Sequence, residues 1–132
     1  MSTKHFLIIA SFMLTLFVCG RAPAEEKGPV VRLAKLQIDA ARLESYKAAL
    51  KGEIETSVCV EPGVLTLYAV YAVSEKDNPI NIMVFEIYAD ENAYRAHLET
   101  PHFKKYKTNT LEMVKSLELV ETVSILVGAK AK

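Results

Sequence analysis

The sequence contains no tryptophan, and cysteine occurs at only two positions, Cys19 and Cys59. It has no G-x-G-x-x-G stretch and no P-loop, so it carries no nucleotide-cofactor signature. A G-x-S-x-G nucleophile elbow and a dense Cys/His cluster with zinc spacing are also missing. Basic and acidic side chains number 16 each, so the chain as a whole has no basic field favouring a nucleic-acid partner. We therefore expect no cofactor, no metal and no nucleic acid, and any redox chemistry would have to be carried by the substrate.

Near the N-terminus, Phe6 to Val18 is a run of 13 mostly apolar residues, too short to span a bilayer comfortably. Lys4 precedes the run, and Ala22-Pro23-Ala24 follows it with the small-x-small pattern that a signal peptidase accepts. We predict that residues 1–24 are a cleaved export signal, so that the protein is periplasmic or secreted and keeps no transmembrane segment. Cleavage removes Lys4 and Arg21 and leaves 14 basic against 16 acidic side chains, a net charge of −2.

The two cysteines have different expected fates. Cys19 ends a Leu-Phe-Val-Cys stretch with the outline of a bacterial lipoprotein box, although Val18 is bulkier than the residue normally required there, so lipidation is an alternative to cleavage. After cleavage only Cys59 remains, and the mature chain cannot form an intrachain disulfide. We expect Cys59 to be a small buried side chain near the end of the first helix. A reactive thiol and an intermolecular disulfide are the alternatives.

Hydrophobic periodicity predicts one α+β domain at residues 30–127, between a leader at 25–29 and a polar tail at 128–132. A stripe at spacings of three and four indicates a first helix from residue 39 or 40, and Glu61-Pro62-Gly63 should end it, with glycine taking a positive φ. Thr100-Pro101 should break the second helical region, because threonine caps well and proline is favoured at the first helical position. We predict strands at 30–38, 64–73, 80–89 and 119–127, a turn-rich connection at 74–79, and a helix from 101 to 117. The order β-α-β-β-α-β is a ferredoxin-like plait.

The central strands are apolar on both faces. A single sheet with helices on one side should alternate apolar and polar residues, yet V-L-T-L-Y-A-V-Y-A-V and I-N-I-M-V-F-E-I-Y do not. A bare sheet face of that composition exceeds what soluble monomers usually expose. We predict that a second copy of the chain covers it in a two-fold homodimer.

Glu86 interrupts the third predicted strand, on the same face as Ile82, Val84 and Tyr88. A carboxylate there is costly to bury unless it is paired or hydrogen-bonded. One interpretation is an ion pair with Arg95 or a lysine. The other is a general base or a group that orients a ligand, with a pKa raised by desolvation.

His97 and His102 flank the predicted helix break. Each is either a capping or rim residue or a proton-transfer group at the edge of a pocket. Their spacing is not the i, i+4 pair of a helical zinc site, and Pro101 lies between them. Nearby aromatic residues are either core or the lining of an apolar cavity for a planar aromatic ligand; these are Tyr68, Tyr88, Tyr94, Phe103 and Tyr106.

The stretch from Glu86 to Phe103 reads E-x-Y-x-D-x-x-A-x-x-x-H-x-x-T-P-H-F. It resembles the antibiotic biosynthesis monooxygenase family of small dimeric α+β barrels, most closely its quinol monooxygenase and autoinducer-processing branches. The resemblance implies cofactor-independent oxygenation of an electron-rich phenol or quinol by dioxygen, with His97, His102 and Glu86 at the matching catalytic positions. The absence of tryptophan argues against the family's haem-degrading branch, and an export signal fits poorly with processing a cytoplasmic autoinducer.

Two hypotheses follow from the sequence. The first is an enzyme, either a cofactor-free monooxygenase or an isomerase acting on a small oxygenated signal molecule. The second is a non-catalytic module that binds a small hydrophobic molecule in the same cavity. A base within hydrogen-bond reach of the cavity would favour the first.

Overall fold

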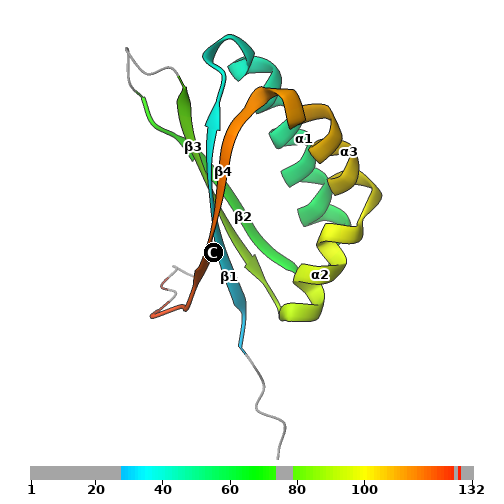
Figure 1. Ribbon diagram of the computed structural model, residues 1–132. Coiled ribbons are helices and arrows are strands. Elements are labelled where there is room, and N and C mark those ends of the chain that lie inside the picture. The colour runs from blue at the N-terminus through cyan, green and yellow to red at the C-terminus, as the bar shows by residue number, and fades with distance from the viewer. Residues whose placement is uncertain (1–27, 74–78, 127, 129–132) are drawn as a thin grey trace, which may run out of the picture.

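The computed structural model describes residues 28–73, 79–126 and 128 as a four-stranded sheet with helices on one face (Figure 1). The predicted export signal with Cys19, most of the 74–79 connection and most of the tail lie outside the described residues. The elements are β1 (Val30–Ile38), a 3₁₀ turn η1 (Ala40–Arg42), α1 (Leu43–Val60), β2 (Val64–Tyr71), β3 (Ile80–Tyr88), α2 (Glu91–Glu99), α3 (Pro101–Thr110), a 3₁₀ turn η2 (Leu111–Met113) and β4 (Val114–Thr122). This order confirms the predicted ferredoxin-like plait.

The strands pair in the order β2-β3-β1-β4, and every neighbouring pair is antiparallel. The register brings residues from all four strands into rows across the sheet. On the helix-covered face one such row is Leu67, Glu86, Arg32 and Glu121. On the other face a row consists of Tyr68, Phe85, Leu33 and Val120.

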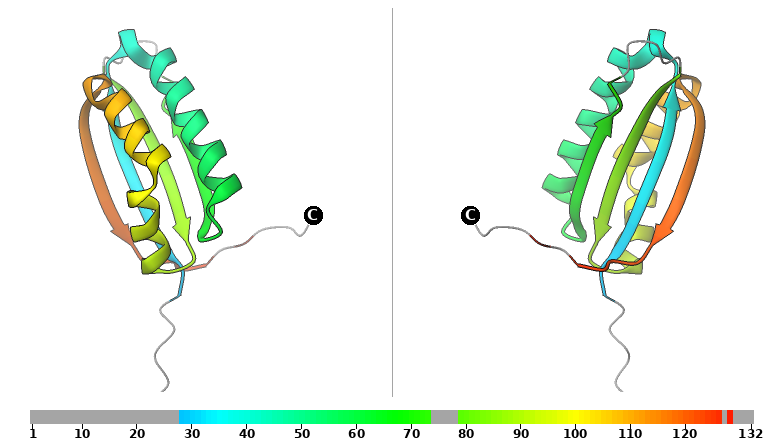
Figure 2. Two further views of the ribbon diagram at one scale, coloured as in Figure 1. Left: turned by 90° about the vertical axis from the view of Figure 1, so that its right-hand side faces the viewer. Right: turned by 90° about the vertical axis from the view of Figure 1, so that its left-hand side faces the viewer.

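The core lies between the sheet and the helix layer, in which α1 and α3 lie side by side (Figure 2). Tyr46 and Leu50 from α1 are buried against sheet residues. Ile38 and Tyr46 are fully buried, as the predicted alternation and helical stripe require. The sheet contributes Ala34, Leu36, Ile38, Ile82 and Val84 to this core.

Asp90 caps α2 by accepting a hydrogen bond from the Ala93 amide at 2.7 Å, and Thr100 caps α3 by accepting one from the Phe103 amide at 3.3 Å. The predicted helix break at Thr100-Pro101 is therefore confirmed, with Pro101 at the first position of α3.

The last helix and last strand were placed wrongly by the sequence pattern. The helix ends at Thr110, and β4 begins at Val114 instead of residue 119. Val114 and Leu117 are three residues apart, a helical spacing, but both belong to β4. They lie opposite Ile38 and Leu36 because the pairing register shifts between Gln37 and Ile38. Strands β2 and β3 also end earlier than predicted, at Tyr71 and Tyr88.

Glycine is needed at position 63 for a steric reason and not for the predicted positive φ. Its backbone does not adopt a positive φ, but a Cβ there would lie 2.4 Å from the Cβ of Ala93. Glycine is therefore required because α2 passes directly over this turn. The predicted burial of Cys59 is also wrong, since its side chain is exposed on α1.

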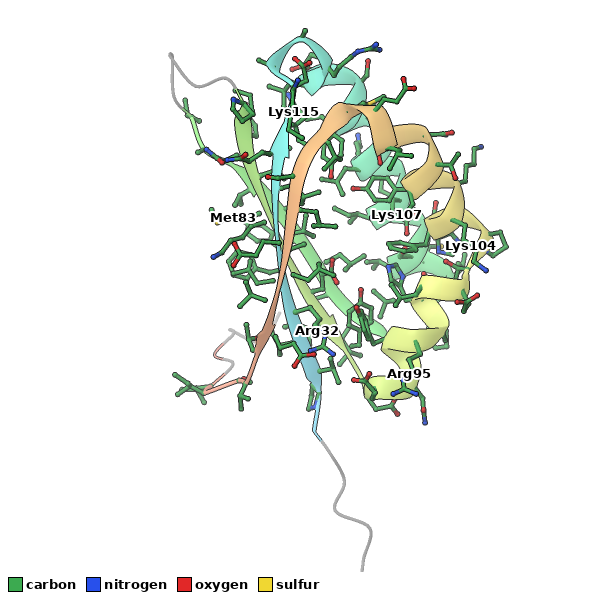
Figure 3. The ribbon with its side chains drawn as sticks, viewed as in Figure 1. Arg32, Met83, Arg95, Lys104, Lys107 and Lys115 are labelled. Carbon is green, nitrogen blue, oxygen red and sulfur yellow. The ribbon has the colours of Figure 1, made fainter. Side chains whose placement is uncertain are left out.

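The face of the sheet opposite the helices has no cover within the described chain (Figure 2). Tyr68 is 61% exposed and Phe85 is 41% exposed there, and Met83 projects from the same side (Figure 3). None of the described helices is long and apolar enough to cross a membrane.

Candidate functional site

An apolar cavity of about 90 Å³ lies between the sheet and the helices. Small side chains of the sheet, Ala34 and Val84, form part of its floor, and the exposed β4 residues Leu117 and Leu119 form its edge. The polar groups that reach it are few: Glu53, Glu86, His97 and Lys107. Its remaining wall consists of Leu36, Leu50, Ile54, Leu67, Tyr94, Leu98, Phe103 and Tyr106.

Glu86 is the carboxylate that β3 presents to this cavity. The Tyr88 hydroxyl donates a hydrogen bond to Glu86 Oε2 at 2.9 Å. Burial raises the pKa of Glu86, and the Tyr88 hydrogen bond and the more distant charges of His97, Arg32 and Lys107 only partly offset it. Desolvation and proximity to Glu86 raise the pKa of Tyr88, so the phenol remains a donor.

The predicted ion pair of Glu86 with Arg95 does not form. Arg95 is exposed and pairs with Glu91 at 3.4 Å. Arg32 lies directly across from Glu86 in the sheet register, but its guanidinium pairs with Glu121 at 3.2 Å and Glu91 at 3.5 Å. Among the described residues, Glu86 therefore has a phenol as its neighbour and no ion-pair partner within 4 Å.

Arg32 and Lys107 are the cations around the cavity (Figure 3). Arg32 reaches from β1 toward α2, where it lies over the ring of Tyr94 at 4.8 Å. Lys107 lines the cavity from α3 and makes no salt bridge to a described residue. One cation is thus fixed by carboxylates, and the other is available to a ligand.

The aromatic residues form a connected wall. His97 packs against Phe103 with ring centroids 4.6 Å apart and against Tyr88 at 5.4 Å. The hydroxyls of Tyr106 and Tyr46 are hydrogen-bonded at 2.5 Å, and burial raises the pKa of both phenols. These phenols are held as neutral groups, so neither of them acts as a base.

The two histidines converge on Glu61, the residue that follows α1. His97 Nδ1 lies 3.0 Å and His102 Nε2 lies 2.6 Å from the same oxygen, Glu61 Oε1. Burial raises the pKa of Glu61, but the hydrogen bonds from His102 and His97 outweigh it, so the pKa is lowered overall. Glu61 is thus held ionised at the junction of three helices.

Glu53 extends this group from the middle of α1. Its carboxylate accepts a hydrogen bond from Ser57 Oγ at 2.8 Å. One ligand atom from each of Glu53, Glu61, His97 and His102 lies within 4.8 Å of the other three. The sequence pattern did not indicate this group, because two of its members are carboxylates far from the histidines in the sequence; the expectation of no bound metal stays a prediction.

The predicted site residues separate into four environments. Glu86, His97, Phe103 and Tyr106 line the cavity, whereas His102 lies behind its wall, against Glu61. Tyr88 is fully buried and reaches the cavity only through Glu86. Tyr68 does not line the cavity, because it lies on the opposite face of the sheet.

Comparison with known proteins agrees with this geometry. A sequence profile for antibiotic biosynthesis monooxygenase matches residues 29–109. A solved Bacteroides thetaiotaomicron protein, named as a proposed antibiotic biosynthesis monooxygenase, is 51% identical with a TM-score of 0.70 over 81% of this chain and 99% of that one. A proposed monooxygenase from Lactobacillus acidophilus is 36% identical with a TM-score of 0.65 over 70% of this chain, which spans only 42% of that protein. The curated proteins gave no match.

A third structure, a proposed antibiotic biosynthesis monooxygenase from Nitrosomonas europaea, shares the fold at 19% identity, with a TM-score of 0.66 over 74% of this chain and 90% of that one. The fold and the cavity define a ferredoxin-like α+β domain with a buried carboxylate facing an apolar pocket. The chain belongs to the antibiotic biosynthesis monooxygenase family. The resemblance drawn from the Glu86–Phe103 motif is thereby confirmed at the level of the family, while its narrower branch stays a prediction.

Proposed function

We propose that the protein is a cofactor-independent monooxygenase that oxidises a small quinol or electron-rich phenol with dioxygen. The observation that carries the proposal is Glu86, a carboxylate with a raised pKa and no cationic partner within ion-pair distance, at the wall of an apolar cavity. A base with such a pKa accepts a proton from a phenolic hydroxyl more readily than an ordinary glutamate does.

The reaction needs only the substrate, dioxygen and this base. Glu86 accepts a proton from the quinol, and the resulting anion gives one electron to dioxygen. The semiquinone and superoxide combine to form a carbon–oxygen bond. The O–O bond then breaks as that carbon loses its hydrogen, and the distal oxygen leaves as water after Glu86 returns its proton. One quinol and one dioxygen thus give one hydroxyquinone and one water.

The cavity limits the substrate. At about 90 Å³ it is well below the roughly 300–1,000 Å³ of pockets that enclose drug-sized ligands. It fits a single ring, with any substituent leaving past Leu117 and Leu119 at the edge. Lys107 lies where it stabilises the anion that forms when Glu86 takes the proton.

His97 and His102 have different roles in this proposal. His97 lines the cavity and contacts Phe103, so it helps to hold the substrate ring. His102 does not line the cavity and acts through Glu61 as a positioning residue. The sequence predicts a catalytic role for both histidines. In this proposal His97 instead contacts the substrate and His102 is a positioning residue.

The test is oxygen uptake by the purified protein with a panel of single-ring quinols and phenols under ¹⁸O₂, with product mass followed in parallel. We expect uptake above the spontaneous rate, one labelled oxygen in the product, and loss of both in Glu86→Gln. The matched control is Glu118→Gln, because Glu118 lies on the opposite face of the sheet and pairs with Lys35. Saturable binding of these compounds with no uptake would reject the oxygenase and favour the alternative, a binding module or an isomerase.

A further inference from the structure

The group formed by Glu53, Glu61, His97 and His102 is not needed as a proton acceptor in the proposed reaction. Glu53 lies within α1 and Glu61 directly follows it. His97 lies in the last turn of α2 and His102 in the first turn of α3. Both histidines direct a ring nitrogen at one carboxylate oxygen, and Glu53 closes the remaining side. Four potential metal ligands from separate parts of the chain therefore lie within 4.8 Å of one another.

This buried group contains two carboxylates and, in the part of the chain that the structure describes, no lysine or arginine partner. Glu53 is 7% exposed and His97 is 3% exposed, and the Glu61 side chain is 11% exposed. Among the described residues, neither carboxylate has a lysine or arginine within salt-bridge distance; Glu61 has only the two histidines. Two buried carboxylates that close to each other repel, and a doubly charged cation between them removes the repulsion.

We propose that Glu53, Glu61, His97 and His102 bind a divalent first-row transition metal ion, with Zn²⁺ as the preferred ion. Two imidazole nitrogens and two carboxylate oxygens are ligands that Zn²⁺ accepts in tetrahedral sites, whereas Mg²⁺ and Ca²⁺ favour oxygen alone. Metal–ligand distances of about 2.0–2.2 Å imply ligand atoms ~3.4 Å apart. The four atoms here lie within 4.8 Å of one another, so small side-chain rotations complete the shell.

An ion can reach the group from the surface, and its binding requires one particular tautomer of each histidine. Glu53 and His102 line a surface groove of about 310 Å³ between α1 and α3, through which an ion reaches the group. In the metal-free chain His97 Nδ1 and His102 Nε2 donate hydrogen bonds to Glu61, so metal binding requires the protons to occupy the other ring nitrogens and replaces these hydrogen bonds. Ser57 supports the site by donating a hydrogen bond to Glu53 at 2.8 Å.

The ion has a structural role in this arrangement. It links the end of α1 to the α2–α3 break, and through His97 it fixes part of the cavity wall. Zn²⁺ does not change oxidation state, so it supplies no electrons to dioxygen. The two sites share His97, but the metal site is tested by measurements that do not depend on oxygen uptake.

The test is titration of the full chain, stripped with a chelator, with ZnCl₂ by calorimetry, and with CoCl₂ by visible absorption. We expect one equivalent of Zn²⁺ with a Kd below about 1 µM, weaker than dedicated structural zinc sites, a higher melting temperature with Zn²⁺, and the intense visible bands of tetrahedral Co²⁺. His102→Ala and Glu53→Gln should each weaken binding by at least about 100-fold. Glu53→Gln keeps the side-chain shape, so it remains informative if His102→Ala does not fold.

Three controls make the outcome decisive. Cys59→Ser should not change Zn²⁺ affinity, because the exposed thiol lies outside the group. Glu99→Gln, on the neighbouring surface of α2, should not change it either. Glu86→Gln should abolish oxygen uptake with Zn²⁺ affinity intact, which separates the two proposals. The metal site is overturned if Zn²⁺ fails to bind, or if it binds equally well to Glu53→Gln and His102→Ala.

Discussion

The phenolic hydroxyl of Tyr88 donates a hydrogen bond to Glu86 at 2.9 Å, and it is the hydrogen-bond donor that the structure gives this carboxylate. The two residues lie on the same face of β3, two positions apart. Arg32 lies opposite Glu86 in the sheet, but its guanidinium pairs with Glu91 and Glu121. Glu86 therefore combines restricted solvation with a single neutral donor. This environment destabilises the charged form and prepares the group to accept a proton.

Replacing Glu86 by glutamine should remove activity and stabilise the fold. Glutamine keeps the oxygen that accepts from Tyr88 but never carries the buried charge. We expect kcat to fall by about 10²–10⁴-fold, the usual contribution of a general base. The melting temperature at pH 7 should rise above that of the parent chain. A lower melting temperature together with retained oxygen uptake would show that Glu86 is a structural residue.

The pH dependence has a defined sign. Because the pKa of Glu86 is raised above 4.5, the folded state holds this proton more tightly than the unfolded chain does. Its contribution to stability is therefore greatest below pH 4.5 and is lost as pH rises through the folded pKa. Oxygen uptake should increase over the same window, because only the ionised form accepts a proton.

Denaturant unfolding at several pH values, compared between the parent chain and Glu86→Gln, isolates this group. The stability advantage of glutamine should be small at low pH and grow as pH rises. Tyr88→Phe removes the hydrogen bond that lowers the pKa of Glu86, so the rise in oxygen uptake should move to higher pH. An unchanged midpoint in Tyr88→Phe would contradict the assignment of the base to Glu86.

The burial of Glu86 could be predicted from the sequence, because side chains in a strand alternate between the two faces. Ile82 and Val84 precede it on a buried face, so a glutamate at the next position had to be enclosed. Its partner could not be predicted, since the choice between a salt bridge and the Tyr88 hydroxyl depends on where Arg32 and Arg95 point. The sequence has both arginines, but only the packed helix α2 directs them to Glu91.

The cluster around Glu61 was missed for a different reason. Hydrophobic spacing in the sequence predicts a buried stripe of Leu43, Tyr46, Leu50 and Ile54, but the buried side chains of α1 are Tyr46, Leu50, Glu53 and Ser57. Polar residues that continue a buried stripe were the available signal. Glu53 and Glu61 meet His97 and His102 only when α1 packs against the α2–α3 break. No local sequence pattern specifies that long-range packing.

Gly63→Ala should destabilise the protein through contact with α2. The new Cβ would lie 2.4 Å from the Cβ of Ala93, so the turn or the helix must move. We expect a loss of about 1–3 kcal/mol, as for other overpacked sites. Urea unfolding measures it. Gly52→Ala is the matched control, because its Cβ meets nothing within 4 Å and a helix interior favours alanine by about 0.5–1 kcal/mol.

A double substitution tests the cause. Ala93→Gly removes the atom that clashes, at a cost of about 1 kcal/mol for glycine inside a helix. If steric contact is the reason for Gly63, the double variant should be more stable than the sum of the single effects implies. Strict additivity would instead assign the effect to the backbone of the turn.

The uncovered face of the sheet is expected to hold a second copy of the chain. The row of Tyr68, Phe85, Leu33 and Val120 crosses all four strands, while the neighbouring end of this face is polar, with Lys35 paired to Glu118 and Gln37 hydrogen-bonded to Asn81 and Ser116. An apolar row of this kind beside a polar rim is the anatomy of a stable interface. We propose a two-fold homodimer, for which light scattering after size exclusion should give twice the chain mass.

Charged substitutions in the apolar row should dissociate this dimer. Phe85→Lys buries an unpaired charge in the contact, and we expect the monomer mass together with a lower melting temperature. Leu111→Lys is the control, since Leu111 is 71% exposed on η2, away from the sheet face. A parent chain that stays monomeric at micromolar concentration, or a Phe85→Lys variant that remains dimeric, would place the partner surface elsewhere. Dissociation with oxygen uptake intact would further show that each cavity works within one copy.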